Sequence, residues 1–305
     1  MRFLLTGATG FLGSRVLRRL LDLGEEVAVI LRSQSNPWRI RDSLGQARTV
    51  IVDPVRPEVW PSVLDEVRPD VVIHLAWHGV AAAQRNDPTQ IDLNLIPTID
   101  LARAAGAAGC GTFIGIGSQA EYGPRKAITR EDDPTLPSTL YGATKLAAGV
   151  LLKQTFAGTG TRFAWARVFS TYGPGDASEW FLPQLIRAML KHQAFEMTLG
   201  EQLWDYLYVD DAAAALIALA QSPAAQGVFN LGSGEVVRIR DVAERVRLLT
   251  QSRGELKLGA VPYRPDQVMH LQADVSRLKG VTGWSPKVSL DLGLKLTVEG
   301  YRSHA

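Results

Sequence analysis

The stretch TGATGFLG, residues 6–13, decides the fold that we expect for this chain. It follows a short apolar run and precedes an amphipathic one, and its glycines stand three positions apart. Glycines in this place permit a tight turn and a close approach of the backbone to a pyrophosphate, which the free N–H groups of the following helix would bind. The stretch therefore predicts a dinucleotide-binding loop, with a plain tight turn as the alternative. The residues expected at the cofactor here are Thr6, Gly7, Thr9, Gly10, Phe11, Leu12 and Gly13.

From this loop outward, short apolar runs alternate with amphipathic stretches, which is typical of a parallel sheet with right-handed helical crossovers. The expected strands are residues 2–5, 27–31, 49–52, 71–75, 112–116 and 163–168. The expected helices are residues 11–23, 57–67, 91–107 and 139–156, the last with Ser138 as its N-cap. We therefore expect an α/β fold, a Rossmann-type doubly wound parallel sheet, over residues 1–168 and about 204–232. Residues 169–203 and 233–305, where Gly- and Pro-rich turns interrupt the alternation, predict a smaller C-terminal α/β domain for the substrate.

The bulk composition favours a small-molecule partner. The 305 residues include 33 basic and 31 acidic ones, scattered along the chain, and a net charge of +2 does not indicate capture of nucleic acid or of a membrane surface. The single cysteine, Cys110, precludes an internal disulfide, and the five histidines lack metal-ligand spacing, so no metal site is expected. No apolar run reaches the roughly 18 residues of a membrane span. The chain opens on a strand rather than a signal peptide, and we expect a cytoplasmic protein.

The end of the second expected strand bears on the choice of dinucleotide. An NAD enzyme would normally carry an acidic residue there for the ribose hydroxyls, but this chain has Arg32 and Ser33 after Leu31. An arginine can pair with the 2′-phosphate of NADP, which favours NADP, with NAD kept as the alternative. A solvated arginine at a strand end is the structural alternative. Asp53 closes the third strand, where it could accept from the adenine amino group or simply form a turn before Pro54.

Tyr141 and Lys145 form a candidate catalytic pair. Their spacing of four places both side chains on one face of the expected helix. A nearby ammonium favours the phenolate and brings a tyrosine closer to acid and base work near neutral pH. Ser118 follows the fifth strand, where a hydroxyl can orient a substrate carbonyl, although a loop serine that caps the next turn is the alternative.

With these residues, the chain resembles the extended short-chain dehydrogenase/reductase family, in particular its nucleotide-sugar epimerases, dehydratases and reductases. The matching motifs span nearly the whole chain: the TGxxGxxG loop, HLA at 74–76, Asn94, Ser118, the YxxxK pair, YGPG at 172–175, YVDDAAAA at 208–215, FNLGSGE at 229–235 and RPD at 264–266. The resemblance implies that Ser118, Tyr141 and Lys145 are catalytic and that Lys145 also holds the nicotinamide ribose. It brings the further expected cofactor contacts to Leu75, Ala76, Asn94, Tyr141, Lys145 and Val168.

The resemblance also implies a nucleotide-diphosphate sugar as substrate. Arg264 and the region around Ser170–Tyr172 would grip its diphosphate, and Trp77 and His78 follow HLA at a strand end that faces the sugar. The expected substrate contacts are Trp77, His78, Ser118, Gln119, Ser170, Tyr172 and Arg264. The helices 91–107 and 139–156 would form a homodimer seam, although their Leu- and Ala-rich faces also fit a packed core.

Several residues depart from the family pattern. Ser170 stands where relatives usually carry Asn, and Trp204 where they carry Arg before the Asp. The 4,6-dehydratases carry an acid pair directly after the serine, but this chain has Gln119 and Ala120, and Glu121 comes one place too late and should point away.

These observations favour one function over two others. The favoured function is an NADPH-dependent ketoreductase acting on a nucleotide-activated 4-keto-6-deoxy-hexose, because no acid pair is present for dehydration. The second is an epimerase that oxidises and re-reduces its sugar on a retained NAD. A non-catalytic dinucleotide sensor is the third, and it has no need of Ser118, Tyr141 and Lys145 together.

Overall fold

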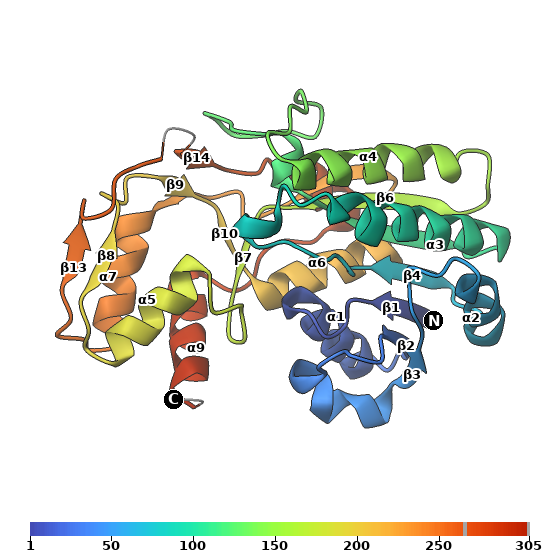
Figure 1. Cartoon of the computed structure of the whole chain (residues 1–305), viewed down its shortest axis with the longest axis horizontal. Helices are drawn as coiled ribbons and strands as arrows, with labels where there is room; N and C mark the ends of the chain where they lie inside the picture. The colour runs from blue at the N-terminus through green and yellow to red at the C-terminus, as the bar shows by residue number, and fades with distance from the viewer. Residues whose placement is uncertain (265–266, 304–305) are drawn as a thin grey trace.

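A seven-stranded parallel sheet forms the centre of the computed structural model, which describes residues 1–264 and 267–303 (Figure 1). Its strands, in spatial order, are β11 (Gly227–Leu231), β6 (Arg162–Val168), β5 (Thr112–Ser118), β4 (Val71–His74), β1 (Arg2–Thr6), β2 (Glu26–Leu31) and β3 (Arg48–Ile51). The chain leaves β1 toward β2 and β3 on one side and returns to β4 on the other. This reversal creates the crevice in which doubly wound sheets bind ligands. The expected fold class is confirmed.

Helices cover both faces of the sheet because its strands carry apolar side chains on both faces. On one face lie α1 (Phe11–Asp22) and α6 (Val209–Gln221), which pack against each other. On the other face lie α2 (Val59–Val67), α3 (Ile96–Ala107) and α4 (Leu140–Thr155). In α1 the buried side chains Val16, Leu17 and Leu20 follow the spacing of one helix face, and all three have no exposed area.

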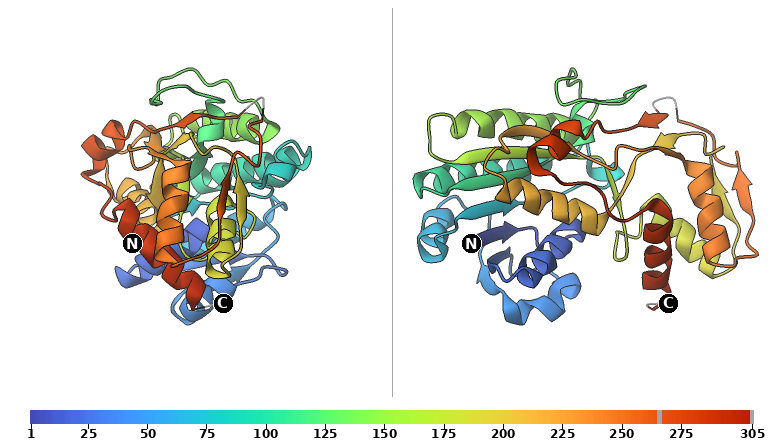
Figure 2. Two further views of the ribbon diagram at one scale, coloured as in Figure 1. Left: turned by 90° about the vertical axis from the view of Figure 1, so that its left-hand side faces the viewer. Right: turned by 180° about the vertical axis from the view of Figure 1, so that it is seen from behind.

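A smaller unit stands beside the sheet, on the left of Figure 1 and on the right of the view from behind in Figure 2. Its strands are β7 (Ser170–Tyr172), β8 (Phe195–Met197), β9 (Leu203–Trp204), β10 (Tyr206–Tyr208), β12 (Val237–Arg238), β13 (Leu256–Leu258) and β14 (His270–Leu271). Its helices are α5 (Phe181–Leu190), α7 (Ile239–Leu249) and α9 (Leu290–Arg302), which share a core of their own. The helix α8 (Ser276–Thr282) lies instead against β11 and α6.

Two local predictions differ from the structure. The N-cap of α4 is Thr139, not Ser138: the Thr139 hydroxyl accepts from the backbone N–H of Gly142 at 3.1 Å, the bond that defines an N-cap. The expected helix 91–107 is broken into a π turn, Ile91–Leu95, followed by α3. Pro97 lacks the N–H that would continue the ladder of α-helical hydrogen bonds, and a π turn precedes it.

Across the described ranges, no helix combines the length and the apolar character that a bilayer crossing requires.

Candidate active site

The glycine loop lies at the crevice, between β1 and the start of α1. Gly7 has a φ of +73°, and a Cβ there would stand 2.6 Å from the backbone of Leu75 and Ala76. A Cβ on Gly13 would collide with the carbonyl of Gly7. Gly10 is the N-cap of α1, and it has no side chain to occupy the first N–H groups of the helix. A bare helix start beside a close-packed loop fits the phosphates of a dinucleotide.

The end of β4 lies directly against this loop. The Thr6 hydroxyl contacts His74 Nδ1 at 2.8 Å and accepts from the backbone N–H of Ala76 at 3.2 Å. His74 Nε2 lies 2.8 Å from the Thr98 hydroxyl, and burial lowers the pKa of His74 to about 3. The side chains of Thr6 and His74 therefore tie β1 to β4 as neutral groups.

Arg32 stands exposed at the carboxyl end of β2, beside exposed Ser33. Its backbone N–H donates to the Ser35 hydroxyl at 2.9 Å, and no carboxylate within the described chain pairs with its guanidinium. Asp53, also exposed, accepts from the backbone N–H of Val55 at 3.3 Å, which is the turn-forming role. The Arg32 guanidinium can therefore meet a phosphate without first breaking an ion pair.

Ser118, Tyr141 and Lys145 come together at the carboxyl end of β5. Ser118 is the last residue of β5, in register with Val168 of β6, and Tyr141 and Lys145 lie on α4. Burial raises the pKa of the Tyr141 phenol, while a hydrogen bond with Ser118 and the charge of Arg85 oppose that rise. The phenol is therefore protonated at neutral pH, as a proton donor must be.

Lys145 is 4% exposed, and its ammonium has defined neighbours. Nζ donates to the carbonyl of Ile116 at 2.7 Å and lies 3.5 Å from the centroid of the Trp77 ring. Burial lowers the pKa of Lys145 to about 7, and the charge of Glu121 opposes that fall.

The Glu121 side chain is buried and holds the backbone of the serine. It closes a capping box with Ser118, whose backbone N–H donates to Glu121 Oε1 at 2.9 Å. Glu121 Oε2 accepts from Arg167 Nε at 2.6 Å and Oε1 from Trp165 Nε1 at 3.0 Å. The Ser-x-x-Glu spacing of 118 and 121 is the sequence signal of a capping box, and it could have indicated this role.

The segment after β4 is held by buried amides. Asn94 lies in the π turn, accepts from the backbone N–H of His78 at 2.6 Å and donates to its carbonyl at 3.0 Å. The Trp77 ring turns to Lys145 and contacts Tyr141 edge-on, whereas the His78 side chain is exposed. Trp77 and His78, both predicted to face the sugar, therefore lie in two different environments.

Arg85 lies beside Tyr141, and no sequence pattern predicts this. Its guanidinium carbon lies 5.5 Å from the centroid of the Tyr141 ring and 5.9 Å from that of Trp180. Its carbonyl accepts from the backbone N–H of Tyr141 at 2.7 Å. Because Trp180 directly precedes α5, Arg85 stands between α4 and the smaller unit. No local motif marks it, since both aromatic partners are distant in sequence.

The other expected substrate residues differ in how far they are buried. Tyr172 is 2% exposed and its hydroxyl donates to the carbonyl of Leu290 at 3.3 Å, so a contact between Tyr172 and substrate stays a prediction. The side chains of β7 alternate, and that of Tyr172 faces the core of the smaller unit. Gln119 and Ser170 are half-buried, and Arg264 is exposed. Asp266 of the RPD segment lies outside the described residues.

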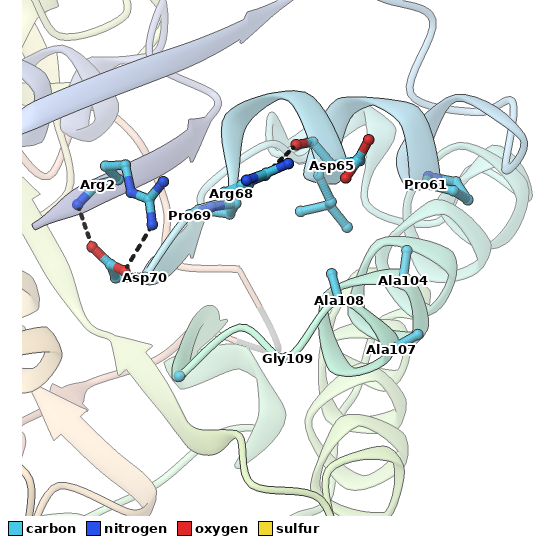
Figure 3. A pocket seen from close by; sticks show the side chains of 12 residues that line it. Arg2, Pro61, Asp65, Arg68, Pro69, Asp70, Ala104, Ala107, Ala108 and Gly109 are labelled. Carbon is cyan, nitrogen blue, oxygen red and sulfur yellow. Dashed lines mark hydrogen bonds and ion pairs between the residues drawn. The ribbon is translucent and has the colours of Figure 1, made fainter.

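A hollow of about 680 Å³ lies apart from this site, between the ends of α2 and α3 (Figure 3). Arg2, at the start of β1, donates its backbone N–H to Asp70 at 2.7 Å on its rim. The glycine loop and Ser118 lie at the carboxyl ends of their strands, so this hollow belongs to the opposite edge of the sheet. We give it no part in the site.

Known proteins resemble the chain over its full length. Residues 3–232 match the NAD dependent epimerase/dehydratase family. GDP-6-deoxy-D-mannose reductase of Pseudomonas aeruginosa is 26% identical over 99% of this chain and 97% of its own. The UDP-glucose 4-epimerase of Thermotoga maritima, solved with UDP-glucose, has a TM-score of 0.90 at 27% identity and covers 100% of this chain and 99% of its own. That of Thermus thermophilus, solved with NAD, has a TM-score of 0.88 at 26% identity and covers both chains in full.

Proposed function

This chain belongs to the NAD dependent epimerase/dehydratase family, and on that premise we propose that it reduces a nucleotide-activated 4-keto-6-deoxy-hexose with NADPH. Membership confirms the resemblance to extended short-chain dehydrogenases, a nicotinamide dinucleotide as cofactor class and an enzyme rather than a sensor. The name of the Pseudomonas relative, a reductase of a 6-deoxy sugar nucleotide, supports the reaction.

One observation carries the proposal: an exposed Arg32, without an acidic partner in the described chain, directly follows β2. A cation there suits the 2′-phosphate of NADPH, the form of the dinucleotide that cells hold as a reducing pool. A second observation narrows the reaction. Gln119 and Ala120 follow Ser118, and neither side chain can act as acid or base at neutral pH, so elimination of water from the sugar lacks its catalysts.

The site chemistry follows from the placement of three side chains. The bound dinucleotide would supply hydride to the carbonyl carbon of the sugar. Tyr141 would donate its phenolic proton to the carbonyl oxygen, and the Ser118 hydroxyl would orient that oxygen. Lys145 would hold the nicotinamide ribose and stabilise the phenolate left behind.

A 4-epimerase acting on a retained NAD is the second candidate, because the Thermotoga and Thermus neighbours carry that name. The same trio serves oxidation and reduction at one carbon, so the residues alone permit both. The two differ in whether the cofactor is consumed.

The deciding experiment supplies a panel of nucleotide 4-keto-6-deoxy sugars with NADPH or NADH. We expect NADPH to be consumed in a one-to-one ratio with a reduced 6-deoxy sugar. Isomerised sugar with no cofactor consumed would overturn the proposal in favour of the epimerase.

Replacing Arg32 by Ala should weaken NADP binding more than NAD binding. A charge-assisted hydrogen bond to phosphate contributes about 1.5–3 kcal/mol, so we expect the ratio of affinities to change by at least about tenfold. Calorimetric titration of both proteins with both cofactors measures this. Arg41→Ala, which also removes an exposed cation, is the control. An unchanged ratio would leave Arg32 as a solvated strand end.

We also propose that the smaller unit binds the nucleotide of the sugar. Half-buried Gln119 directly follows Ser118, half-buried Ser170 begins β7, and exposed Arg264 supplies positive charge from the smaller unit. A guanidinium is suited to a diphosphate.

Replacement of Tyr172 should act on stability rather than on substrate affinity, because its side chain is buried.

A homodimer would bury an apolar surface on the outer side of α3 and α4. The exposed apolar residues of the π turn, α3 and α4 are Ile91, Leu93, Ile96, Val150 and Leu151. We expect a mass of two chains in solution, and we expect Val150→Glu to give single chains, because an unpaired carboxylate in an apolar interface is strongly unfavourable. Leu248→Glu on α7, 69% exposed in wild type, is the control. Light scattering after gel filtration separates the outcomes, and a Val150→Glu dimer would contradict this surface.

A further inference from the structure

Two of the directions around the Lys145 ammonium are already taken. Nζ donates to the carbonyl of Ile116 at 2.7 Å on the side of β5, and the Trp77 ring lies 3.5 Å away on another side. A cation over the face of an indole is attracted by the ring, more strongly where water is excluded, and Lys145 is 4% exposed. An ammonium has three N–H groups, so one N–H remains for a ligand.

The position of the Trp77 ring is itself fixed. Its Nε1–H donates to Gln90 Oε1 at 2.9 Å, and Gln90 is 1% exposed. Gln90 Nε2 in turn donates to the carbonyl of Gly79 at 2.7 Å, and Asn94 donates to Gln90 Oε1 at 3.1 Å. Because each of these amides has its partners in the segment after β4, the ring cannot turn without breaking buried hydrogen bonds.

We propose that Trp77 is a positioning residue for Lys145, whose ammonium its ring, anchored by Gln90, directs toward the ribose of the dinucleotide. This inference rests on the proposed role of Lys145 as the ribose ligand and deepens it. Under this proposal Trp77 acts on the cofactor through Lys145 and does not make the sugar contact that the sequence predicts.

The ring also acts on the charge of Lys145. Burial lowers the pKa of Lys145 to about 7, and Glu121 opposes that fall. The other titratable groups that face the ammonium are Tyr141 on α4 and His74 on β4, and burial keeps His74 neutral by lowering its pKa to about 3. The ring stabilises the ammonium relative to the amine, so its removal should lower the pKa of Lys145 further. The ammonium would then be lost at a lower pH.

The test measures the dissociation constant of NADPH and of NADH by calorimetry, across the pH range around neutrality. Trp77→Leu should bind the cofactor about tenfold more weakly, and the loss of affinity on the alkaline side should move down by about one pH unit. Trp77→Phe keeps a π face but, like Leu, lacks the N–H, and its affinity should stay within about threefold of wild type. Equal effects of Phe and Leu would overturn the proposal, because the ring face would then be irrelevant.

A double-mutant cycle with Lys145→Met separates positioning from packing. In that background Trp77→Leu should change cofactor affinity by less than about twofold, because the ammonium on which the ring acts is gone. Additive effects would show that Trp77 only supports the fold. Trp77→Met takes the place of the Leu variant if the latter does not fold. These readouts use cofactor binding alone, so a sugar that is epimerised rather than reduced would overturn the proposed function and leave this test intact.

Discussion

Tyr141→Phe is expected to lower turnover of the keto sugar by about 10²–10⁴-fold, because it removes the only proton that the phenol can supply. The phenyl ring would keep its edge contact with Trp77 and its place beside Arg85, so folding and cofactor affinity should be retained. The result is read as kcat with NADPH, beside the dissociation constant of NADPH. Both are needed to show that the proton, rather than binding, is lost.

Tyr301→Phe provides the matched control. Tyr301 donates its hydroxyl to the carbonyl of Asp176 at 3.3 Å in the smaller unit, and its loss should leave kcat within about twofold. A Tyr141→Phe enzyme with wild-type turnover would remove Tyr141 from the reaction and would direct attention to another proton donor.

The parts of the site that the sequence predicts well are those in which neighbours along the chain make the contact. The glycine pattern is local, because a Cβ on Gly13 would collide with Gly7 and Ala8 of the same loop, although a Cβ on Gly7 would meet Leu75 and Ala76 directly after β4. The pair Tyr141 and Lys145 is local for the same reason, since one helix turn sets their common face. Such patterns need no knowledge of the tertiary fold.

The parts that the sequence does not predict depend on register and on distant partners. Trp77 meets Lys145 across 68 positions of the chain, and neither residue type indicates the other. The burial of Tyr172 depends on which face of the short strand β7 meets α9, and a motif resemblance carries no information on that register. The π turn at Asn94 follows from a proline three positions later, whose effect on a helix ranges from a kink to a break.

Glu121 makes one contact with a neighbour in sequence, Ser118, and one with a distant residue, Arg167. We expect its charge to contribute to the stability of the fold as well as to the position of Ser118. Its partner Arg167 comes from β6, and the side chains of the two residues are 0% and 6% exposed. Glu121 also accepts from the backbone N–H of Ser118. The same carboxylate therefore positions Ser118 and neutralises a guanidinium in the core.

Glu121→Gln should lower the free energy of unfolding by about 3–5 kcal/mol, because it leaves the Arg167 charge buried without a counterion while the amide oxygen can still accept from Ser118. Chemical denaturation measures the loss. Asp291→Asn breaks the exposed pair with Arg245, at 2.8 Å, and should cost no more than about 1 kcal/mol. The double variant Glu121→Leu, Arg167→Met should regain much of the stability, since two apolar side chains replace the pair without leaving a lone charge. A Glu121→Gln protein as stable as wild type would mean that water reaches Arg167, and the pair would then hold Ser118 in place without contributing to the core.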